Sequence, residues 1–364
     1  MEWSAVPKAG YPIKPLTAAG LQRPYMSFQN LLLPFKLLFS MWLSWKIIKD
    51  FRPDVVVGTG GYVAAPVCLV AALTGHPLVI QEQNACPGIT NRILSQFAIK
   101  IFVAFSSAAS FFPKEKCALR GNPTRLAFNR YISSAVSRRL FFPNGLPISL
   151  QAVRRRKHSE QAVLQANSDS LEVLLILGGS LGARSINLAV AGMVSEMLEK
   201  YPGRHVIWQT GVKYFDQMVS LVKGHPRLVI LGFIDKMEMA FAAADLVVAR
   251  AGAITCSEIL VAGKPSILVP SSNVAEDHQM KNASFMVQTG ASKLLLDKGL
   301  NSETLATVIN DTLGSKGLVQ GMSANASKAA APYAARQIAE ELLLIARKKA
   351  ADTLCKSSAK ICFT

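Results

Sequence analysis

One segment, DLVVARAGAITCSEILVAGKPSILVP (Asp245–Pro270), constrains the fold more than any other part of the chain. It predicts a buried strand over 245–249, a glycine-containing turn, a helix beginning at Thr255 and a second buried strand over 265–269. Thr255 and Glu258 have the spacing of a capping box. A helix that begins just beyond a strand's carboxyl end offers free N–H groups and partial positive charge, which suit a phosphate. The alternative is that Thr255 and Glu258 only cap the helix.

The same alternation of apolar strand and helical segment recurs along the chain. Further strands are expected over 54–58, 77–81, 100–105, 172–177, 205–209 and 227–232. Apolar strands separated by helical segments are typical of parallel sheets covered by helices on both faces. The 364 residues are enough for two such domains, each with its own core.

The charge balance favours an anionic partner, because 40 basic residues stand against 23 acidic ones, a net charge of +17. No basic surface interleaved with aromatic residues supports nucleic acid as that partner. The six cysteines are scattered without a C-x-x-C pair, so neither a zinc site nor a disulfide framework is expected, and a reducing compartment is. The N-terminus shows no secretory or transit pattern, which favours a soluble interior location.

The longest apolar stretch, Leu31–Ile48, is interrupted by Pro34, Lys36 and Lys46, so it does not predict a membrane span. As a helix it carries Phe35, Leu38, Phe39 and Trp42 on one face. Two interpretations stay open: an ordinary core-facing helix, or an interfacial helix whose apolar face and lysines meet anionic lipid.

Two glycine-rich loops follow predicted strands. GGSLGARS (Gly178–Ser185) lets a ligand approach the backbone closely, but it is neither G-x-G-x-x-G nor a Walker loop, and no acidic residue ends the next strand, which disfavours a dinucleotide. GTGGYVAAP (Gly58–Pro66) is a weaker signal of the same kind. Glu82 and Asn84, in EQN, follow a buried strand and indicate either a ligand site or a helix cap. His278 has no partner at metal-ligand spacing, and no D-x-D pair occurs.

Taken together, GTGGYV, QEQNACPGITN, GNPTR, GGSLGAR, GFIDKM, ARAGAITCSEILVAGKPSILVP and EDHQMKNA closely resemble the MurG family. The resemblance runs from about Val6 to Ala339, apart from Ser134–Ser170. It implies an α/β protein of the GT-B glycosyltransferase fold, with two Rossmann-like domains facing a cleft. The implied activity is a hexosyltransferase reaction that moves GlcNAc from UDP-GlcNAc to lipid I, giving lipid II, with inversion, without a cofactor and without a metal.

The resemblance also implies a role for each matching residue. The main chain around Ile234 would hold uridine, Glu258 the ribose, Gln279 the GlcNAc hydroxyls, and Asn84 and Arg125 would complete the donor site from the other lobe. The turn and helix start at Ala253, Ile254 and Thr255 would hold the diphosphate with the help of Ser180, and Cys256 and Ser257 belong to the implied donor site as well. Gly60, Gly61, Tyr62 and Glu82 would face the lipid-linked acceptor, and Phe35, Leu38 and Trp42 an anionic membrane surface. The implied location is peripheral, on the cytoplasmic face of a membrane, or in a plastid if the source is a plant or alga.

The domains expected from this reading are an acceptor and membrane-side domain over 1–130, a poorly ordered linker or insertion over 131–170, a UDP-GlcNAc domain over 171–345 and a basic tail over 346–364. The family pattern starts with a strand and a GGTGGH-like loop whose histidine matches no residue here, so the expected N-domain lacks its first strand and loop. Glu82 is then the candidate base, and impaired activity is expected. The alternatives are a non-catalytic UDP-sugar-binding relative, and a GT-B transferase acting on another lipid such as diacylglycerol.

Overall fold

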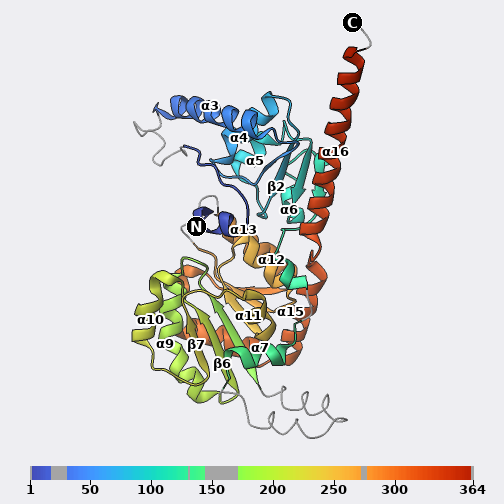
Figure 1. Cartoon of the computed structure of the whole chain (residues 1–364). Coiled ribbons are helices and arrows are strands. Elements are labelled where there is room, and N and C mark those ends of the chain that lie inside the picture. The colour runs from blue at the N-terminus through green and yellow to red at the C-terminus, as the bar shows by residue number, and fades with distance from the viewer. Residues whose placement is uncertain (1, 18–30, 130–131, 144–170, 272–276, 362–364) are drawn as a thin grey trace. The chain divides into compact units, whose positions relative to one another are not determined.

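The computed structural model describes residues 2–17, 31–129, 132–143, 171–271 and 277–361 (Figure 1). The chain divides into two compact units, one formed by 1–121 together with 336–364 and the other by 122–335. Each unit contains one all-parallel sheet, as the alternation of strands and helices predicts.

The second unit holds a six-stranded sheet in the order β10-β9-β8-β5-β6-β7. Its strands are β5 (Glu172–Leu177), β6 (Arg204–Gln209), β7 (Leu228–Leu231), β8 (Leu246–Ala249), β9 (Ser266–Leu268) and β10 (Ser292–Leu294). The chain builds outward from β5 to β7 and then returns to β8, which pairs with β5 from Leu174↔Leu246 to Leu177↔Ala249. The loops that follow β5 and β8 therefore leave neighbouring strands in opposite directions, which is where open sheets of this kind bind ligands.

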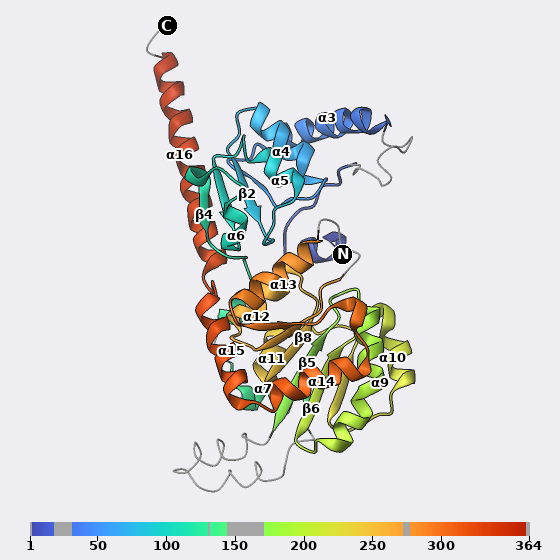
Figure 2. The same ribbon diagram turned by 180° about the vertical axis from the view of Figure 1, so that it is seen from behind.

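Helices cover both faces of this sheet (Figure 2). One face packs against α9 (Arg184–Lys200), α10 (Phe215–Leu221) and α14 (Ser302–Leu313), with Trp208, Ile186 and Ile309 fully buried between the layers. The other face carries α11 (Met237–Ala243) and α12 (Ala253–Val261). The remaining elements of the unit are η2 (Leu126–Asn129), α7 (Ser134–Phe141), η5 (Val212–Tyr214), α13 (His278–Gln288), η7 (Asp297–Gly299) and α15 (Lys316–Ala329).

The first unit holds a four-stranded sheet in sequential order, with β1 (Val56–Gly58), β2 (Leu78–Glu82), β3 (Lys100–Val103) and β4 (Cys117–Leu119). One face is covered by α4 (Ala64–Leu73), α5 (Ile89–Leu94) and α6 (Ser106–Ala109), and α3 (Leu33–Phe51) packs on the outside of α4 through Ile48. The opposite face is closed by α16 (Ala334–Ile361), whose Ile338 contacts Val79 and Phe102. The short elements α1 (Glu2–Lys8) and η1 (Lys114–Lys116) complete the unit.

The unit boundaries differ from the expected domains. Asn122 and the residues after it group with the second unit, while 336–345 return to the first as part of α16. The expected linker begins with the helix α7, in which Arg138 is buried and pairs with Asp245 at 2.7 Å. This part of the linker is therefore ordered, and 144–170 lie outside the described residues. The expected tail, from residue 346, continues α16 as far as Ile361.

Candidate functional site

The second unit has a cavity of about 900 Å³ at the junction of the loops that follow β5 and β8. The glycine-rich loop after β5 forms one wall, Gly252 and Thr255 at the start of α12 another, and Gln279 of α13 lies on the rim. Three residues predicted to touch the donor, Ser180, Thr255 and Gln279, thus line one cavity. A volume of this size is typical of sites for small molecules and cofactors.

The glycine-rich loop can adopt its path only without side chains at two positions. Gly179 and Gly182 have φ values of +78° and +83°, in the left-handed region. Gly182 also packs directly against the carbonyl of Thr210 and the ring of Tyr214, so a methyl group there would collide with both. The close packing holds the loop after β5 against the segment after β6.

The start of α12 differs from the sequence prediction. The N-cap is Gly252, no side chain caps the helix, and Thr255 lies inside the first turn, so the predicted capping box with Glu258 is wrong. Asn122 donates from Nδ2 to Ser257 Oγ at 2.9 Å and to the Ala253 carbonyl at 3.3 Å, which braces the turn without covering its N–H groups. The uncapped helix start, with its partial positive charge, therefore faces the cavity.

Two further predictions for α12 need correction. Cys256 is completely buried, and burial raises the pKa of its thiol to about 12, so it remains a neutral core residue. Ser257 is 8% exposed, and its hydroxyl donates to the Ala253 carbonyl at 3.0 Å. Because helical side chains point in different directions, only part of the predicted run of donor residues can face the cavity.

Glu258 has an unusual environment. Burial raises the pKa of its carboxyl from 4.5 to about 7, and the charge of Arg125 opposes that rise. Arg125 donates from Nη1 to the Asp235 carbonyl at 3.2 Å. Arg125 was expected to come from the other lobe, but it groups with the second unit, since the unit begins at Asn122. A half-ionised carboxyl beside a guanidinium is suited to accept hydrogen bonds from a ligand's hydroxyl groups.

Arg250 follows β8 and lines the cavity, and it was not predicted as a site residue. Its guanidinium binds Asp297 Oδ1 at 2.9 Å, Ser185 Oγ at 2.8 Å and the Val269 carbonyl at 3.1 Å. Ser185 also donates to Asp297 Oδ1, at 2.6 Å. One partly buried guanidinium thus joins the segments after β5, β8, β9 and β10. A charged residue directly after a buried strand was the available signal.

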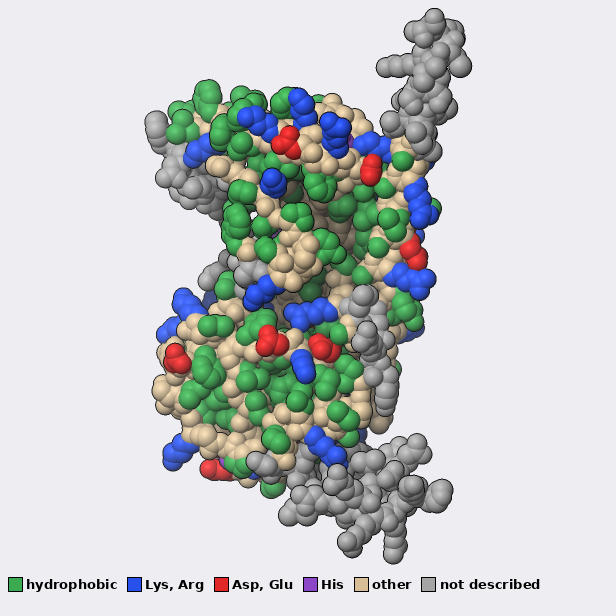
Figure 3. All heavy atoms as spheres, in the orientation of Figure 1, with side chains coloured by type: hydrophobic (Ala, Val, Ile, Leu, Met, Phe, Trp, Pro, Cys, Tyr) green, Lys and Arg blue, Asp and Glu red, His purple; other side chains and the backbone are tan. Residues whose placement is uncertain are grey.

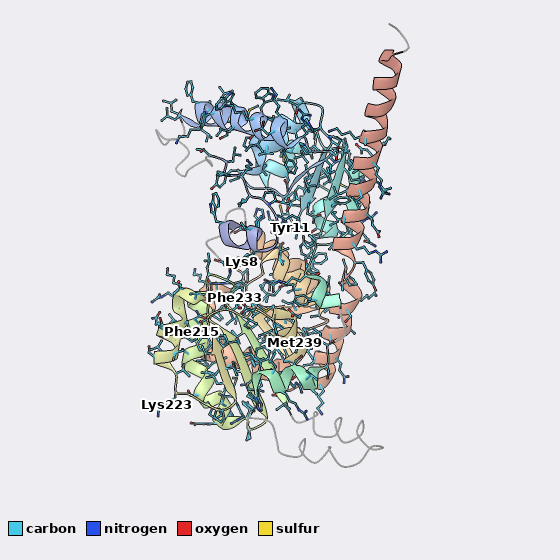
Figure 4. The ribbon with its side chains drawn as sticks, in the orientation of Figure 1. Lys8, Tyr11, Phe215, Lys223, Phe233 and Met239 are labelled. Carbon is cyan, nitrogen blue, oxygen red and sulfur yellow. The ribbon has the colours of Figure 1, made fainter. Side chains whose placement is uncertain are left out.

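Gln209, at the end of β6, was also missed. Its Oε1 accepts from the Ile234 N–H at 2.9 Å, and its Nε2 donates to the Gly179 carbonyl at 3.1 Å. Ile234 is 3% exposed and its N–H is taken, whereas Phe233, labelled in Figure 4, is 44% exposed. A nucleotide's base could therefore donate hydrogen bonds to the main-chain carbonyls of this segment. It could accept a bond from the Ile234 N–H only by displacing Gln209.

At the rim, Gln279 accepts from the Ser271 N–H at 2.8 Å through Oε1, so its amide nitrogen is the part suited to donate to a sugar oxygen. His278 is the first residue of α13. Part of the predicted polar loop, 272–276, lies outside the described residues. Within the described part of the chain, no group of three or more His, Cys, Asp or Glu side chains could hold a metal ion.

In the first unit, the residues predicted for the acceptor lie after β1 and β2. Gly60 and Gly61 have φ values of +89° and +79°, and Tyr62 is 57% exposed. Glu82 is 2% exposed and accepts hydrogen bonds from Asn84 and Asn91 side chains at 3.3 and 2.8 Å. The buried and hydrogen-bonded carboxylate of Glu82 is therefore poorly placed to act as a general base, the role predicted from the sequence.

The predicted interfacial helix, α3, exposes a continuous apolar surface. Its exposed members are Phe35 (71%), Leu38 (63%), Phe39 (51%), Trp42 (48%) and Trp45 (42%). Lys46 Nζ lies 3.6 Å from the centre of the Trp42 ring and Lys49 Nζ 5.0 Å from that of Trp45. Figure 3 shows apolar and basic side chains side by side over the segment labelled α3 in Figure 1. The core-facing interpretation is therefore wrong for this face, and no helix among the described residues meets the length and hydropathy needed to cross a membrane.

Two units that each hold an all-parallel sheet, one of them with a cavity where its strand order reverses, have the architecture of the GT-B glycosyltransferase fold. The family models agree: the glycosyltransferase family 28 N-terminal domain matches residues 1–103 and the family 28 C-terminal domain matches 173–338. Within that class, the chain belongs to the MurG family.

The similarity extends over nearly the whole chain. A protein of Salinibacter ruber named UDP-N-acetylglucosamine--N-acetylmuramyl-(pentapeptide) pyrophosphoryl-undecaprenol N-acetylglucosamine transferase is 42% identical over 95% of this chain and 86% of its own length. A protein of the same name from Flavobacterium psychrophilum is 41% identical over 94% and 86%. The crystal structure of Acinetobacter baumannii MurG matches with a TM-score of 0.66 and 28% identity, covering 93% of this chain and 87% of that one.

Proposed function

We propose that this chain transfers GlcNAc from UDP-GlcNAc to lipid I, forming lipid II, as the names of its relatives describe. The observation that carries the proposal is the cavity of the second unit, where an uncapped helix start and a glycine-rich loop meet at the reversal of strand order. Backbone N–H groups and a helix dipole at that point suit a diphosphate.

Each donor group would have a chemically matched partner. The diphosphate would lie against the first turn of α12 and Ser180, the ribose hydroxyls would donate to Glu258, and Gln279 would bind the sugar from the rim. Arg125 favours the ionised form of Glu258, which is the form that accepts two hydrogen bonds. Asn84, in the first unit, remains a predicted sugar contact.

The reaction would proceed with inversion and without a metal. As the acceptor hydroxyl attacks the sugar carbon, it gives up its proton to a general base or to water. The bond between that carbon and the diphosphate oxygen breaks, and negative charge develops on departing UDP. The fixed N–H groups and dipole of α12 are oriented to stabilise that charge. Metal independence stays a prediction, and unchanged turnover in the presence of a chelator is the expected result.

Membrane attachment would bring the enzyme to its lipid-linked acceptor. The exposed aromatic and leucine side chains of α3, with Lys46 and Lys49 beside them, form a surface suited to the interface of an anionic bilayer. We propose a peripheral association at the cytoplasmic face, where an intracellular nucleotide sugar is available.

The test is transfer of labelled GlcNAc from UDP-GlcNAc to a lipid I substrate, with chromatographic identification of lipid II. Calorimetric titration of UDP-GlcNAc should show that Glu258→Ala weakens binding by about 1–3 kcal/mol, because two hydroxyl donors lose a charged acceptor. Glu303→Ala, an exposed glutamate of α14 outside the cavity lining, is the matched control.

The alternatives give different results in the same assays. Binding of UDP-GlcNAc without transfer to any lipid would support a non-catalytic sugar-nucleotide-binding protein. Transfer to diacylglycerol but not to lipid I would replace the proposed acceptor. If Glu258→Ala binds UDP-GlcNAc as tightly as the parent, Glu258 does not bind the ribose. The transfer assay decides on the transferase activity separately.

A further inference from the structure

The carboxyl end of β2 contains a buried carboxylate whose bonding capacity is fully used. Glu82 Oε1 accepts from the Asn84 backbone N–H at 2.9 Å and from Asn84 Nδ2 at 3.3 Å. Its Oε2 accepts from the Gly88 N–H at 3.3 Å and from Asn91 Nδ2 at 2.8 Å. An ionised carboxylate has about four acceptor positions, so Glu82 has no vacant position for the proton of a substrate hydroxyl.

Asn91 connects Glu82 to a second loop, the 58–62 segment. It lies on α5, is 2% exposed, and contacts Gly60 closely: a Cβ atom at residue 60 would lie 3.2 Å from Asn91 Nδ2. Gly60 has a φ of +89° and begins the glycine pair that precedes α4. Glu82 thus fixes the 83–88 segment directly, and through Asn91 it supports the 58–62 segment, which it does not itself bond.

The orientation of the Asn91 amide is also informative. Its Nδ2 must face Glu82, because the reverse orientation would place an amide oxygen against the carboxylate. Its Oδ1 is consequently buried, and it has no hydrogen-bond partner among the residues that the structure describes. A buried oxygen without a hydrogen-bond partner is unfavourable and uncommon in native proteins, so the orientation of this amide calls for a structural explanation.

We propose that Glu82 and Asn91 form a clamp that holds the 58–62 and 83–88 segments in one arrangement for the lipid-linked acceptor, so that Glu82 is a positioning residue and not the catalytic base. The proposal rests on the proposed transferase function for its purpose, but its structural content concerns the two segments alone. A carboxylate that is bonded to four donors keeps its shape through a reaction cycle, which is what precise placement of an acceptor hydroxyl requires.

The first test measures amide hydrogen exchange and needs no turnover. Glu82→Gln should raise exchange in both 58–62 and 83–91, because either orientation of the new amide sets an NH₂ group against N–H donors. Glu115→Gln, the same change at an exposed glutamate of the first unit, should alter neither segment. Asn91→Ala removes the bridging amide whichever way the side chain at position 82 turns, so unchanged exchange in 58–62 in that variant would overturn the clamp, because Asn91 would then not support the Gly60 loop.

The second test restores the pairing by exchanging the two groups. In the Glu82→Gln, Asn91→Asp double variant, the glutamine NH₂ donates to the aspartate and its oxygen still accepts from Asn84. Of the four bonds to Glu82, only the one from the Gly88 N–H, at 3.3 Å, is not replaced. Glu82→Gln alone should lower kcat by roughly 10²-fold, and the double variant should recover most of that loss. The Kd of UDP, which lacks the sugar that Asn84 would contact, should stay unchanged in both. If the double variant recovers protection from exchange but not kcat, the proposal is overturned, because the carboxylate of Glu82 would then take part in the reaction itself. If the parent itself shows no transfer, the proposed function fails, while the exchange measurement still decides on the clamp.

Discussion

Glu258 connects proton binding to donor binding at the scale of a single side chain. Its pKa, raised to about 7 by burial, means that the free protein holds this carboxyl partly protonated near neutrality. In the proposed donor complex the ribose hydroxyl groups donate to the ionised form of Glu258, so a bound donor would lower that pKa and binding would release a proton. Affinity should therefore rise as pH increases towards and through 7, and fall by up to about tenfold per unit below it.

The measurement is calorimetric titration of UDP-GlcNAc across this range in buffers of different ionisation enthalpy, which reveals the released proton. The diphosphate of a nucleotide sugar does not titrate near neutrality, so the slope reports the protein. Glu258→Gln should flatten the profile. A slope that persists in this variant would assign the titration to another group.

At the scale of an element, α3 should control membrane attachment. Phe35→Ser with Trp42→Ser removes two of the exposed rings, and Trp42 also stacks on Phe39 at 5.8 Å. Sedimentation with anionic vesicles should fall by at least about tenfold, since each ring contributes apolar area at the lipid interface. Binding by the parent should also weaken with salt, because Lys46 and Lys49 lie beside the rings.

The control for this experiment is Val219→Ser with Leu221→Ser, which removes two exposed apolar side chains from α10 in the second unit. If this variant loses vesicle binding as much as the α3 variant does, general surface hydropathy is responsible and not α3.

The glycine-rich loop after β5 offers a second comparison at this scale. Gly179→Ala and Gly182→Ala strain the same left-handed backbone, but only residue 182 packs against Thr210 and Tyr214. Gly179→Ala should cost about 1 kcal/mol in the free energy of unfolding, and Gly182→Ala roughly 1–3 kcal/mol more, measured by denaturant titration. Equal losses would mean that the loop relaxes away from β6.

The alternation of strands and helices could be predicted because buried strands such as β5 and β6 contain a run of apolar residues, VLLIL in β5 and VIW in β6. The strands β4 and β10 were missed: each has three residues, among them Lys293 and an exposed Leu119, and lies at a sheet edge. Ser180, Thr255 and Gln279 were found because each lies in a motif of the family. Arg250, Gln209 and Asn122 were not, since their partners lie far away in sequence and only the folded sheet brings them together.

At the scale of the whole molecule, the last helix stabilises a unit that begins with the first residues. Ile338, 7% exposed, covers Val79 and Phe102 on the sheet of the first unit. Ile338→Ala should destabilise that unit by about 2–4 kcal/mol, while the affinity for UDP, which is proposed to bind in the cavity of the second unit, stays unchanged. Leu344→Ala, on the same helix and 63% exposed, should change neither quantity. Thermal unfolding followed with and without UDP checks this, and a loss of affinity would mean that the two units do not respond independently.

The return of α16 to the first unit also has a consequence for synthesis. A ribosome delivers residues 122–335, an uninterrupted stretch, before it delivers the helix that closes the earlier sheet. The donor-binding half can therefore mature first, although it is translated second. Until α16 is synthesised, Val79 and Phe102 stay exposed on the nascent chain, where binding to chaperones would prevent aggregation.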